Sequence, residues 1–215
     1  MSRRIIIVDD HPLFRAALRQ TLAGDTEIVI DEAGDLVALS ASLEADRDCD
    51  LVLLDLNMPG AHGFSGLLLV RAQYPEVPVM IISAIEDQKV IRRTFELGAA
   101  GYLPKSVGPA QIRTAIDTVL RGEVVVPEGI NLTVDDEQTA LIRRLSTLTP
   151  QQIRVLMMLS DGLMNKQIAY ELSISEATVK AHVSSILQKL DVDSRTQAVI
   201  AASRIEQGQF EQLLA

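Results

Sequence analysis

The sequence predicts two domains of different class: an N-terminal α/β domain built on an open, doubly wound, five-stranded parallel sheet, and a small all-α C-terminal domain. In the first half of the chain, short apolar runs alternate five times with segments of helical periodicity. Beyond about residue 145 only helical patterns occur. A length of 215 residues with 47% hydrophobic residues is sufficient for two small cores.

The strands of the first domain are expected in short segments that are too apolar to alternate between a buried and a solvated face: 3–7, 27–33, 51–55, 77–83 and 100–104. Such strands are typical of a parallel sheet that helices cover on both faces. The covering helices are expected at 12–23, 35–45, 63–74, 89–98 and 109–122. Pro12 and Pro109 suit a first helical turn, and Gly98 and Gly122 suit helix ends.

The second domain is expected to be a bundle of about four helices, at 149–162, 165–173, 175–190 and 194–207. Between the domains, the stretch 123–145 begins with a short strand-like run and then becomes acidic and polar, and it is interpreted as a linker that becomes helical toward Leu145. The predicted domains are therefore residues 1–122 and 146–215. The net charge of −9 argues neither for nor against nucleic-acid binding.

Several protein classes are excluded. The longest apolar stretches, such as 77–85, are too short to span a bilayer. Arg3 and Arg4 precede an apolar run that ends after four residues at two aspartates, which rules out a signal peptide. Cys49 is the only cysteine, so neither a disulfide framework nor a cysteine metal cluster is expected. A soluble protein of the cytoplasm is predicted.

Three carboxylates gather at the predicted carboxyl edge of the sheet. Asp9 and Asp10 end the first strand and Asp55 ends the third, and in the flavodoxin-like order 2-1-3-4-5 these strands are neighbours about 5 Å apart. Such carboxylates coexist by sharing protons or by holding a hard cation, and Mg²⁺ suits an oxygen-only site of this size. Ser83 ends the fourth strand and Lys105 follows the fifth. Together these groups indicate a phosphoryl-transfer site.

Each of these residues has a simpler interpretation when it is taken alone. Asp10 could equally cap the first helix, His11 could be a local cap or a solvated neighbour of the site, and His62 is expected to be solvated. Other phosphate sites are excluded, because no glycine occurs before Gly24 and no P-loop lysine motif is present. Asn57 stands where a phosphatase with an aspartate nucleophile usually carries its second aspartate.

The stretch 164–190 has the pattern of a short helix, a tight turn and a longer amphipathic helix, which is the helix-turn-helix arrangement. Ser175 is placed to cap the longer helix, and Glu176 complements the positive end of that helix. Its polar face carries donors suited to phosphates and base edges, namely Lys180, Ser184, Ser185, Gln188 and Lys189. An ordinary bundle helix has the same pattern, so the pattern alone leaves nucleic-acid binding open.

The segments "VDDHPLFR", "LLDLNMPGAHG", "IISA" and "GYLPKS" resemble the receiver domain of bacterial two-component response regulators, from residue 3 to about 122. The resemblance implies that Asp55 accepts a phosphoryl group from a kinase phosphohistidine. It further implies that Mg²⁺ is held by Asp9, Asp10, Asp55 and the backbone carbonyl of Asn57. Lys105 and Ser83 would contact the phosphoryl oxygens, and Tyr102 would change rotamer with Ser83. Unlike many receivers, this chain has Ser106, not proline, after Lys105.

Residues 148 to about 202 resemble the LuxR-type DNA-binding domain, so the whole chain is similar to NarL/FixJ-type regulators. The resemblance implies a recognition helix at about 176–190 in the major groove and a dimer surface on the final helix. Residues facing bases would be Lys180, Ala181 and Ser184, and those near phosphates would be Lys166, Thr178, Lys189 and Arg195.

Three departures from this family pattern are informative. Met164 and Gln167 occupy positions that often form a capping box, which suggests Asn165 as the cap. Gln152 stands in place of a charged residue, and Ser184 in place of a frequent basic one. Because few cations then remain, the predicted salt dependence of DNA binding corresponds to roughly three to four phosphate contacts per monomer.

The two resemblances imply a phosphorylation-activated, DNA-binding transcription regulator of a two-component system, which is a switch and not an enzyme. Its partners would be a sensor histidine kinase, double-stranded DNA and, on activation, a second copy of the chain. Two alternatives stay open: a constitutive DNA-binding regulator with an unused receiver, and a phosphorelay or phosphatase-like protein whose helical tail binds protein. The complete set of site residues argues against the first, and the stretch "TVKAHVSSILQKL" argues against the second.

Overall fold

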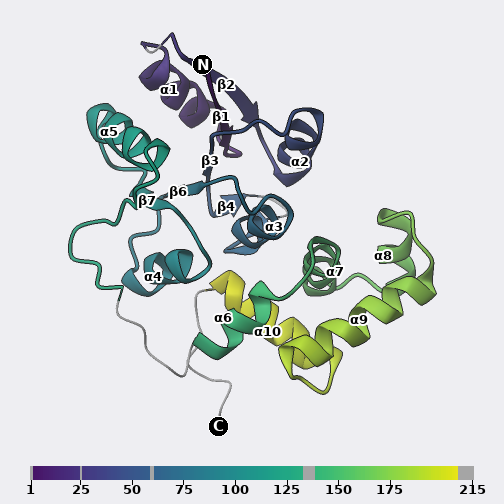
Figure 1. Cartoon of the computed structure of the whole chain (residues 1–215). Helices are drawn as coiled ribbons and strands as arrows, with labels where there is room; N and C mark the ends of the chain where they lie inside the picture. The colour runs from purple at the N-terminus through teal and green to yellow at the C-terminus, as the bar shows by residue number, and fades with distance from the viewer. Residues whose placement is uncertain (1, 25, 59–60, 133–138, 208–215) are drawn as a thin grey trace. The chain divides into compact units, whose positions relative to one another are not determined.

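The computed structural model describes residues 2–24, 26–58, 61–132 and 139–207. The chain divides into two compact units, Met1–Thr133 and Val134–Ala215, which are described separately below (Figure 1). The first unit holds every strand found in the described residues, and the second holds helices alone. This arrangement confirms the predicted combination of an α/β domain and an all-α domain.

The first unit contains a parallel sheet in the strand order β2-β1-β3-β6-β7, which is the predicted order 2-1-3-4-5. Apart from Arg3 and Arg4 at the start of β1, residues of the three inner strands are almost completely buried because helices cover both faces. The strands are β1 (Arg3–Val8), β2 (Ile28–Ala33), β3 (Leu51–Leu54), β6 (Val79–Ser83) and β7 (Gly101–Pro104).

Five helices surround this sheet: α1 (Pro12–Leu22), α2 (Leu36–Ala45), α3 (Ser65–Gln73), α4 (Gln88–Glu96) and α5 (Pro109–Leu120). Figure 1 shows α1 and α5 side by side against one face, with α2 and α3 on the other. Residues of α1 and α5, such as Leu18 and Ile116, join inward-facing strand residues, such as Ile5 and Leu53, in one apolar cluster. As expected, Pro12 and Pro109 begin their helices.

One feature of this unit was not anticipated, and a second was anticipated only as a strand-like run. After β3, a short antiparallel pair forms between β4 (Asn57–Met58) and β5 (Ala61–His62). In the stretch 123–145, Val125 lies along β7, where its carbonyl accepts a hydrogen bond of 3.0 Å from Tyr102 N. The strand-like run at the start of this stretch therefore extends the sheet edge by a single bridge and not by a full strand.

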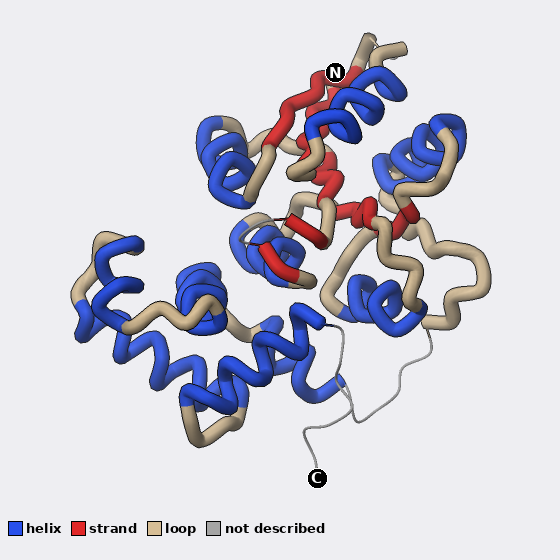
Figure 2. Tube along the Cα trace, turned by 180° about the vertical axis from the view of Figure 1, so that it is seen from behind, coloured by secondary structure: helices blue, strands red, loops and turns tan. Residues whose placement is uncertain are grey.

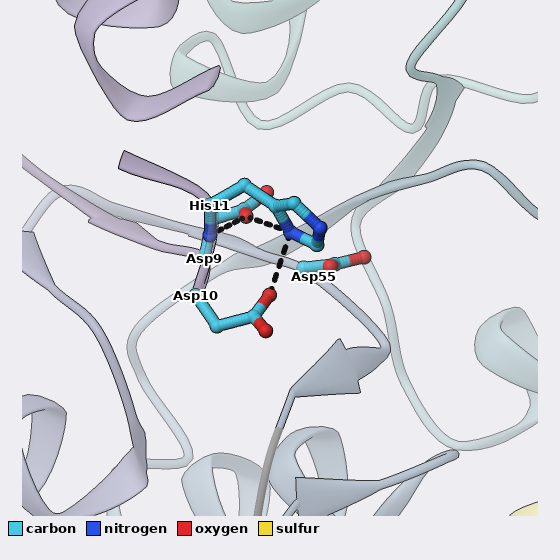
Figure 3. Close-up of side chains that lie close together, drawn as sticks. All are labelled: Asp9, Asp10, His11 and Asp55. Carbon is cyan, nitrogen blue, oxygen red and sulfur yellow. Dashed lines mark hydrogen bonds and ion pairs between the residues drawn. The ribbon is translucent and has the colours of Figure 1, made fainter. Parts of the chain in front are cut away.

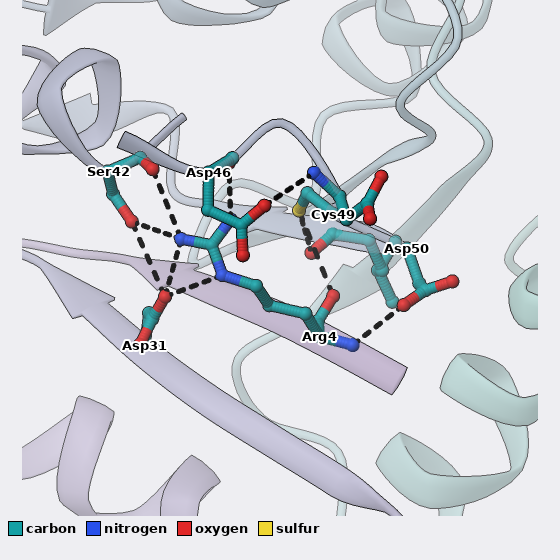
Figure 4. A network of polar contacts seen from close by, with 8 residues as sticks. Arg4, Asp31, Ser42, Asp46, Cys49 and Asp50 are labelled. Atoms are coloured by element: carbon teal, nitrogen blue, oxygen red, sulfur yellow. Dashed lines mark hydrogen bonds and ion pairs between the residues drawn. The ribbon is translucent and has the colours of Figure 1, made fainter. Parts of the chain in front are cut away.

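Arg4 links three elements at the end of the sheet opposite the carboxyl ends of the strands (Figure 4). Its guanidinium donates to Asp31 Oδ2 on β2 at 2.8 Å, to Ser42 Oγ on α2 at 2.7 Å and to the Asp46 carbonyl at 2.7 Å. These bonds satisfy an arginine side chain that is 13% exposed. Arg4 therefore anchors α2 against β1 and β2.

The second unit contains α6 (Thr139–Ser146), α7 (Pro150–Ser160), α8 (Asn165–Glu171), α9 (Glu176–Leu190) and α10 (Arg195–Gln207), which Figure 2 shows from behind. Apolar residues from α7, α8 and α9 are buried between these helices, among them Leu156, Ile168 and Val179. Among the residues described here, no helix is both long and apolar enough to cross a membrane.

The helix caps of this unit give one confirmation and one correction. Ser175 caps α9 as predicted, since its Oγ accepts a hydrogen bond of 3.0 Å from Thr178 N. The prediction that Asn165 caps α8 was wrong, because the cap position is Met164. Gln167 Oε1 accepts the Met164 N–H at 2.7 Å, so half of a capping box is present without a capping side chain.

Candidate functional site

Asp9 and Asp55 lie side by side because of the register of their strands. Val8 pairs with Leu54, and Asp55 N donates to the Val8 carbonyl at 2.9 Å, so the next residue of each strand meets at the carboxyl edge of the sheet. Both aspartates are buried, with 2% and 4% exposure. Two carboxylates in a buried position require compensating positive charge.

Lys105 supplies part of that charge. Its ammonium lies 2.6 Å from Asp9 Oδ2 and 2.8 Å from Asp55 Oδ2. The backbone N–H of Lys105 donates to the Ser83 carbonyl at 2.8 Å, which fixes the start of the loop after β7. Nζ also lies 4.7 Å from the centre of the Phe14 ring, a favourable cation–π contact that the sequence did not reveal.

His11 and Asp10 complete the cluster, as Figure 3 shows. Nδ1 of His11 lies 3.1 Å from Asp9 Oδ1 and 2.7 Å from Asp10 Oδ1. The cap position of α1 is His11, so the alternative in which Asp10 caps this helix was wrong. Arg15, which was not predicted as a site residue, donates to the Asp9 carbonyl at 2.6 Å and thereby stabilises the turn between β1 and α1.

The electrostatics of the cluster leave it short of positive charge. Burial raises the pKa of Asp55, an effect that Lys105 opposes and that the neighbouring Asp9 reinforces. Burial alone would lower the pKa of Lys105, but its bonds to Asp55 and Asp9 raise the pKa above the usual value. Asp55 Oδ1 is buried and makes no hydrogen bond within the described part of the chain.

These residues fit a hard divalent cation. Asp9, Asp10, His11 and Asp55 each offer a ligand atom, and these atoms all lie within 4.8 Å of one another. Most of the donors are carboxylate oxygens, which Mg²⁺ prefers, and one of those oxygens is buried without a partner among the described residues. Asn57, whose backbone carbonyl the resemblance adds to this set, begins β4 just beyond Asp55.

Ser83 and Tyr102 meet at the loop between β6 and α4. Ser83 is completely buried at the end of β6, and its Oγ accepts the Ile85 N–H at 3.3 Å. The Tyr102 hydroxyl donates to the Ile85 carbonyl at 2.5 Å. Tyr102 is also fully buried, and this burial raises the pKa of its phenol to about 12. Both side chains therefore hold the same loop residue.

The polar face of α9 is the second candidate surface. Thr178, Lys180, Ala181 and Ser184 are exposed, whereas Val179, Ile186 and Leu190 are buried on the opposite face. Lys166 is exposed on α8. Lys180 forms an ion pair of 3.0 Å with Glu176 one turn earlier, so part of its charge is neutralised within the helix.

Lys189 and Arg195 are half-buried and cross-link helices. Lys189 Nζ donates to the Thr147 carbonyl at 2.7 Å and to Gln152 Oε1 at 2.8 Å. Arg195 donates to Asn165 Oδ1 at 3.1 Å and to the Leu163 carbonyl at 2.5 Å. Both residues therefore have structural partners besides any phosphate that they bind.

Gln152 links α7 to α9, a role that goes beyond the missing charge at this position. It is 6% exposed and donates through Nε2 to Ser185 Oγ at 2.8 Å. Its Oε1 also accepts the Thr149 N–H at 3.0 Å, while Thr149 Oγ1 accepts the Gln152 N–H at 3.3 Å. The sequence T-x-x-Q is a capping-box signal that could have identified this position.

Comparison with known proteins gives matches over both units. The family model described as "Response regulator receiver domain" matches residues 5–117, and that described as "Bacterial regulatory proteins, luxR family" matches residues 146–202. The Glycerol metabolism activator of Pseudomonas putida is 42% identical, covering 94% of this chain and 96% of the relative. The Nitrate/nitrite response regulator protein NarP of Escherichia coli is 38% identical, covering 92% and 93%.

Solved structures show the same fold. RcsB from Salmonella enterica serovar Typhimurium, bound to promoter rprA, superposes with a TM-score of 0.57 at 21% identity, over 95% of this chain and all of the other. A LuxR family DNA-binding response regulator from Silicibacter pomeroyi is 33% identical with a TM-score of 0.53, covering 59% of this chain and 98% of that protein.

Proposed function

The chain belongs to the response regulators that join a receiver domain to a LuxR-type DNA-binding domain, and on this premise we propose that phosphorylation of Asp55 controls its DNA binding. The observation that carries the proposal is the Asp55 carboxylate, buried beside Lys105 with one oxygen unpartnered among the described residues. We assign residues 1–122 to the receiver, 123–145 to a linker and 146–215 to the DNA-binding domain. The protein acts in the cytoplasm, where a sensor histidine kinase supplies the phosphoryl group.

The chemical step is transfer to a carboxylate oxygen. One oxygen of the Asp55 carboxylate attacks the phosphorus of the kinase phosphohistidine, an O–P bond forms, and the P–N bond breaks with its electrons going to the imidazole. Asp9, Asp10, Asp55 and the Asn57 carbonyl would hold Mg²⁺, which when bound offsets negative charge on the phosphoryl oxygens. Lys105, which is paired with Asp9 and Asp55, turns toward the phosphoryl group as charge develops there.

The switch acts through the loop before α4. Ser83 Oγ, which accepts from Ile85 N, turns to donate to a phosphoryl oxygen, and this turn weakens the bond from Ile85 N. Tyr102, bonded to the carbonyl of the same residue, follows that movement and changes rotamer. Because Ile85 precedes α4, the change reaches the adjoining surface of the receiver and favours a dimer.

The output is DNA binding by α9. Lys180, Ala181 and Ser184 are exposed and face the bases of the major groove, while Lys166 and Thr178 approach phosphates. Lys189 and Arg195 approach phosphates while they keep their bonds within the domain. A dimer places two such helices in half-sites about one helical turn apart.

Intact mass after incubation with Mg²⁺ and acetyl phosphate tests the chemistry. We expect one added phosphoryl group on the native chain and none on Asp55→Asn or in EDTA. DNA affinity, measured with and without beryllofluoride, then tests the switch, and equal affinity would overturn it in favour of constitutive binding. Turnover of acetyl phosphate without DNA binding would instead support the phosphatase-like alternative.

A further inference from the structure

His11 places a nitrogen atom inside the acidic cluster of Asp9, Asp10 and Asp55. Its backbone N–H donates to Asp9 Oδ1 at 2.8 Å, and its ring Nδ1 lies within 3.1 Å of one oxygen of Asp9 and 2.7 Å of one oxygen of Asp10. Figure 3 shows the ring turned toward the three carboxylates and not away from them. The backbone at His11 is extended, as expected for a residue that precedes a proline, here Pro12 at the start of α1.

A second observation independently indicates that the cluster binds a ligand. The Asp55 side chain is 2% exposed, and its Oδ1 has no hydrogen-bond partner within the described residues. A buried carboxylate oxygen without a partner is costly, and a cation would satisfy it. Lys105 cannot satisfy it in this arrangement, because its ammonium is bonded to the other oxygen.

The spacing of the four ligand atoms suits one ion. Bonds of about 2.0–2.2 Å from a metal to nitrogen or oxygen place its ligands at most about 4.4 Å from one another. The ligand atoms of Asp9, Asp10, His11 and Asp55 lie within 4.8 Å of one another, so shifts of a few tenths of an ångström complete the site. The His11 side chain is 66% exposed, so it can make such a shift freely.

We propose that His11 is a nitrogen ligand of this site, which therefore binds borderline divalent cations such as Co²⁺ and Ni²⁺ more tightly, relative to Mg²⁺, than three carboxylates alone would. Imidazole suits these ions, whereas Mg²⁺ prefers oxygen. The inference rests on the proposed function, since it concerns the same cation site. His11 then determines which divalent ions can serve the receiver.

Calorimetric titration of the full chain with MgCl₂ and with CoCl₂ tests this proposal without any phosphorylation assay. In His11→Ala we expect the Co²⁺ affinity to fall about tenfold, which is typical of substitutions around a bound metal. The Mg²⁺ affinity should change less than twofold. The visible absorption of bound Co²⁺ should also lose its nitrogen-ligand character in this variant. His62→Ala is the matched control, because this histidine lies in β5, next to Asn57.

The outcomes separate the inference from the proposed function. If Mg²⁺ binds and His11→Ala leaves the ratio of Co²⁺ to Mg²⁺ affinity unchanged, the inference fails and the proposed function stands. The inference likewise fails if His62→Ala, and not His11→Ala, removes the Co²⁺ preference. If Co²⁺ binds through His11 but Mg²⁺ does not bind, the inference holds and the proposed use of Mg²⁺ fails.

Discussion

The ammonium of Lys105 lies 2.8 Å from Asp55 Oδ2, while Asp55 Oδ1 is buried without a hydrogen bond to any described residue. The same ammonium also serves Asp9 at 2.6 Å. One cation is therefore shared between two buried carboxylates, and the site is under-neutralised until another cation binds. The unfavourable charge at this site is expected to lower the stability of the free protein, as functional sites commonly do.

Asp55→Asn should therefore stabilise the protein in EDTA. We expect the free energy of unfolding at pH 7 to rise by roughly 1–3 kcal/mol, the cost of an unsatisfied buried group. Burial raises the folded-state pKa of Asp55, so this carboxylate costs stability as the pH rises from the unfolded-state value of 3.8 through the folded-state value. The advantage of the variant should be present at pH 7 and fade as the pH approaches 4, which urea unfolding can measure.

Magnesium provides the control for this prediction. Added MgCl₂ should stabilise the native chain, because a ligand that binds only the folded state shifts the unfolding equilibrium. Asp55→Asn should gain much less. A variant that is less stable than the native chain at pH 7 in EDTA would show that the carboxylate is adequately paired.

The fold and the centre of the site could be predicted because both depend on strong local signals. Apolar strands that lack alternation indicate a two-sided parallel sheet, and once its order is assumed, Asp9 and Asp55 must meet at its carboxyl edge. The family assignment made from four spaced motifs is confirmed by the matching family models.

The unpredicted features depend on contacts between distant parts of the chain. Phe14 gives no sign in the sequence that its ring faces the Lys105 ammonium, since the two residues meet only when the folded domain brings the loop after β7 to the start of α1. Asn165 was wrongly predicted to be a cap because an asparagine at a helix start usually caps it. Here the side chain of Gln167 satisfies the preceding N–H, and Asn165 accepts a hydrogen bond from Arg195 on α10.

Gln152→Glu should alter the charge of the DNA-binding domain at one position. The new carboxylate would pair with Lys189, whose ammonium is now held by neutral oxygens at 2.7 and 2.8 Å. We expect the salt dependence of DNA binding to fall by about one phosphate contact. Stability should change by less than about 1 kcal/mol, because burial of the new charge and loss of the donor to Ser185 offset the gain from the ion pair. Fluorescence anisotropy at several salt concentrations measures the first effect, and thermal unfolding measures the second.

Gln152→Leu distinguishes charge from packing at this position. It removes the bonds to Ser185, Lys189 and Thr149 and introduces an apolar side chain of similar size. We expect it to cost roughly 1–3 kcal/mol and to leave Lys189 charged, so the salt dependence should not fall. An equal fall in both variants would mean that Lys189 does not carry the effect.

Two neighbouring substitutions in the turn between α8 and α9 should change the stability of the domain in opposite directions. Ser173 has a φ of +53°, a left-handed conformation that costs a serine about 1 kcal/mol relative to glycine, so Ser173→Gly should stabilise the domain by up to that amount. Ser175→Ala removes the cap of α9 and should cost about 1 kcal/mol. Urea unfolding of the two variants checks both signs, and a destabilised Ser173→Gly would show that the serine side chain stabilises the turn.

The single thiol of the chain should be poorly reactive in the folded state. Burial raises the pKa of Cys49 to about 11, and its Sγ lies 3.4 Å from the Leu51 carbonyl, beside the bonds that Arg4 makes (Figure 4). Because the thiolate is the nucleophile, iodoacetamide at pH 8 should label the folded chain roughly a hundredfold more slowly than the urea-unfolded chain. Intact mass follows this reaction unambiguously, since Cys49 is the only cysteine.

Arg4→Met tests whether the polar network around Arg4 protects this thiol. The variant removes the bonds from Arg4 to Asp31, Ser42 and Asp46, and α2 should then separate more often from the sheet. We expect labelling of Cys49 to accelerate while the strands retain their secondary structure. Fast labelling of the native chain would contradict the burial on which the prediction depends. Equally slow labelling of both chains would mean that packing around β3, and not the Arg4 network, shields the sulfur.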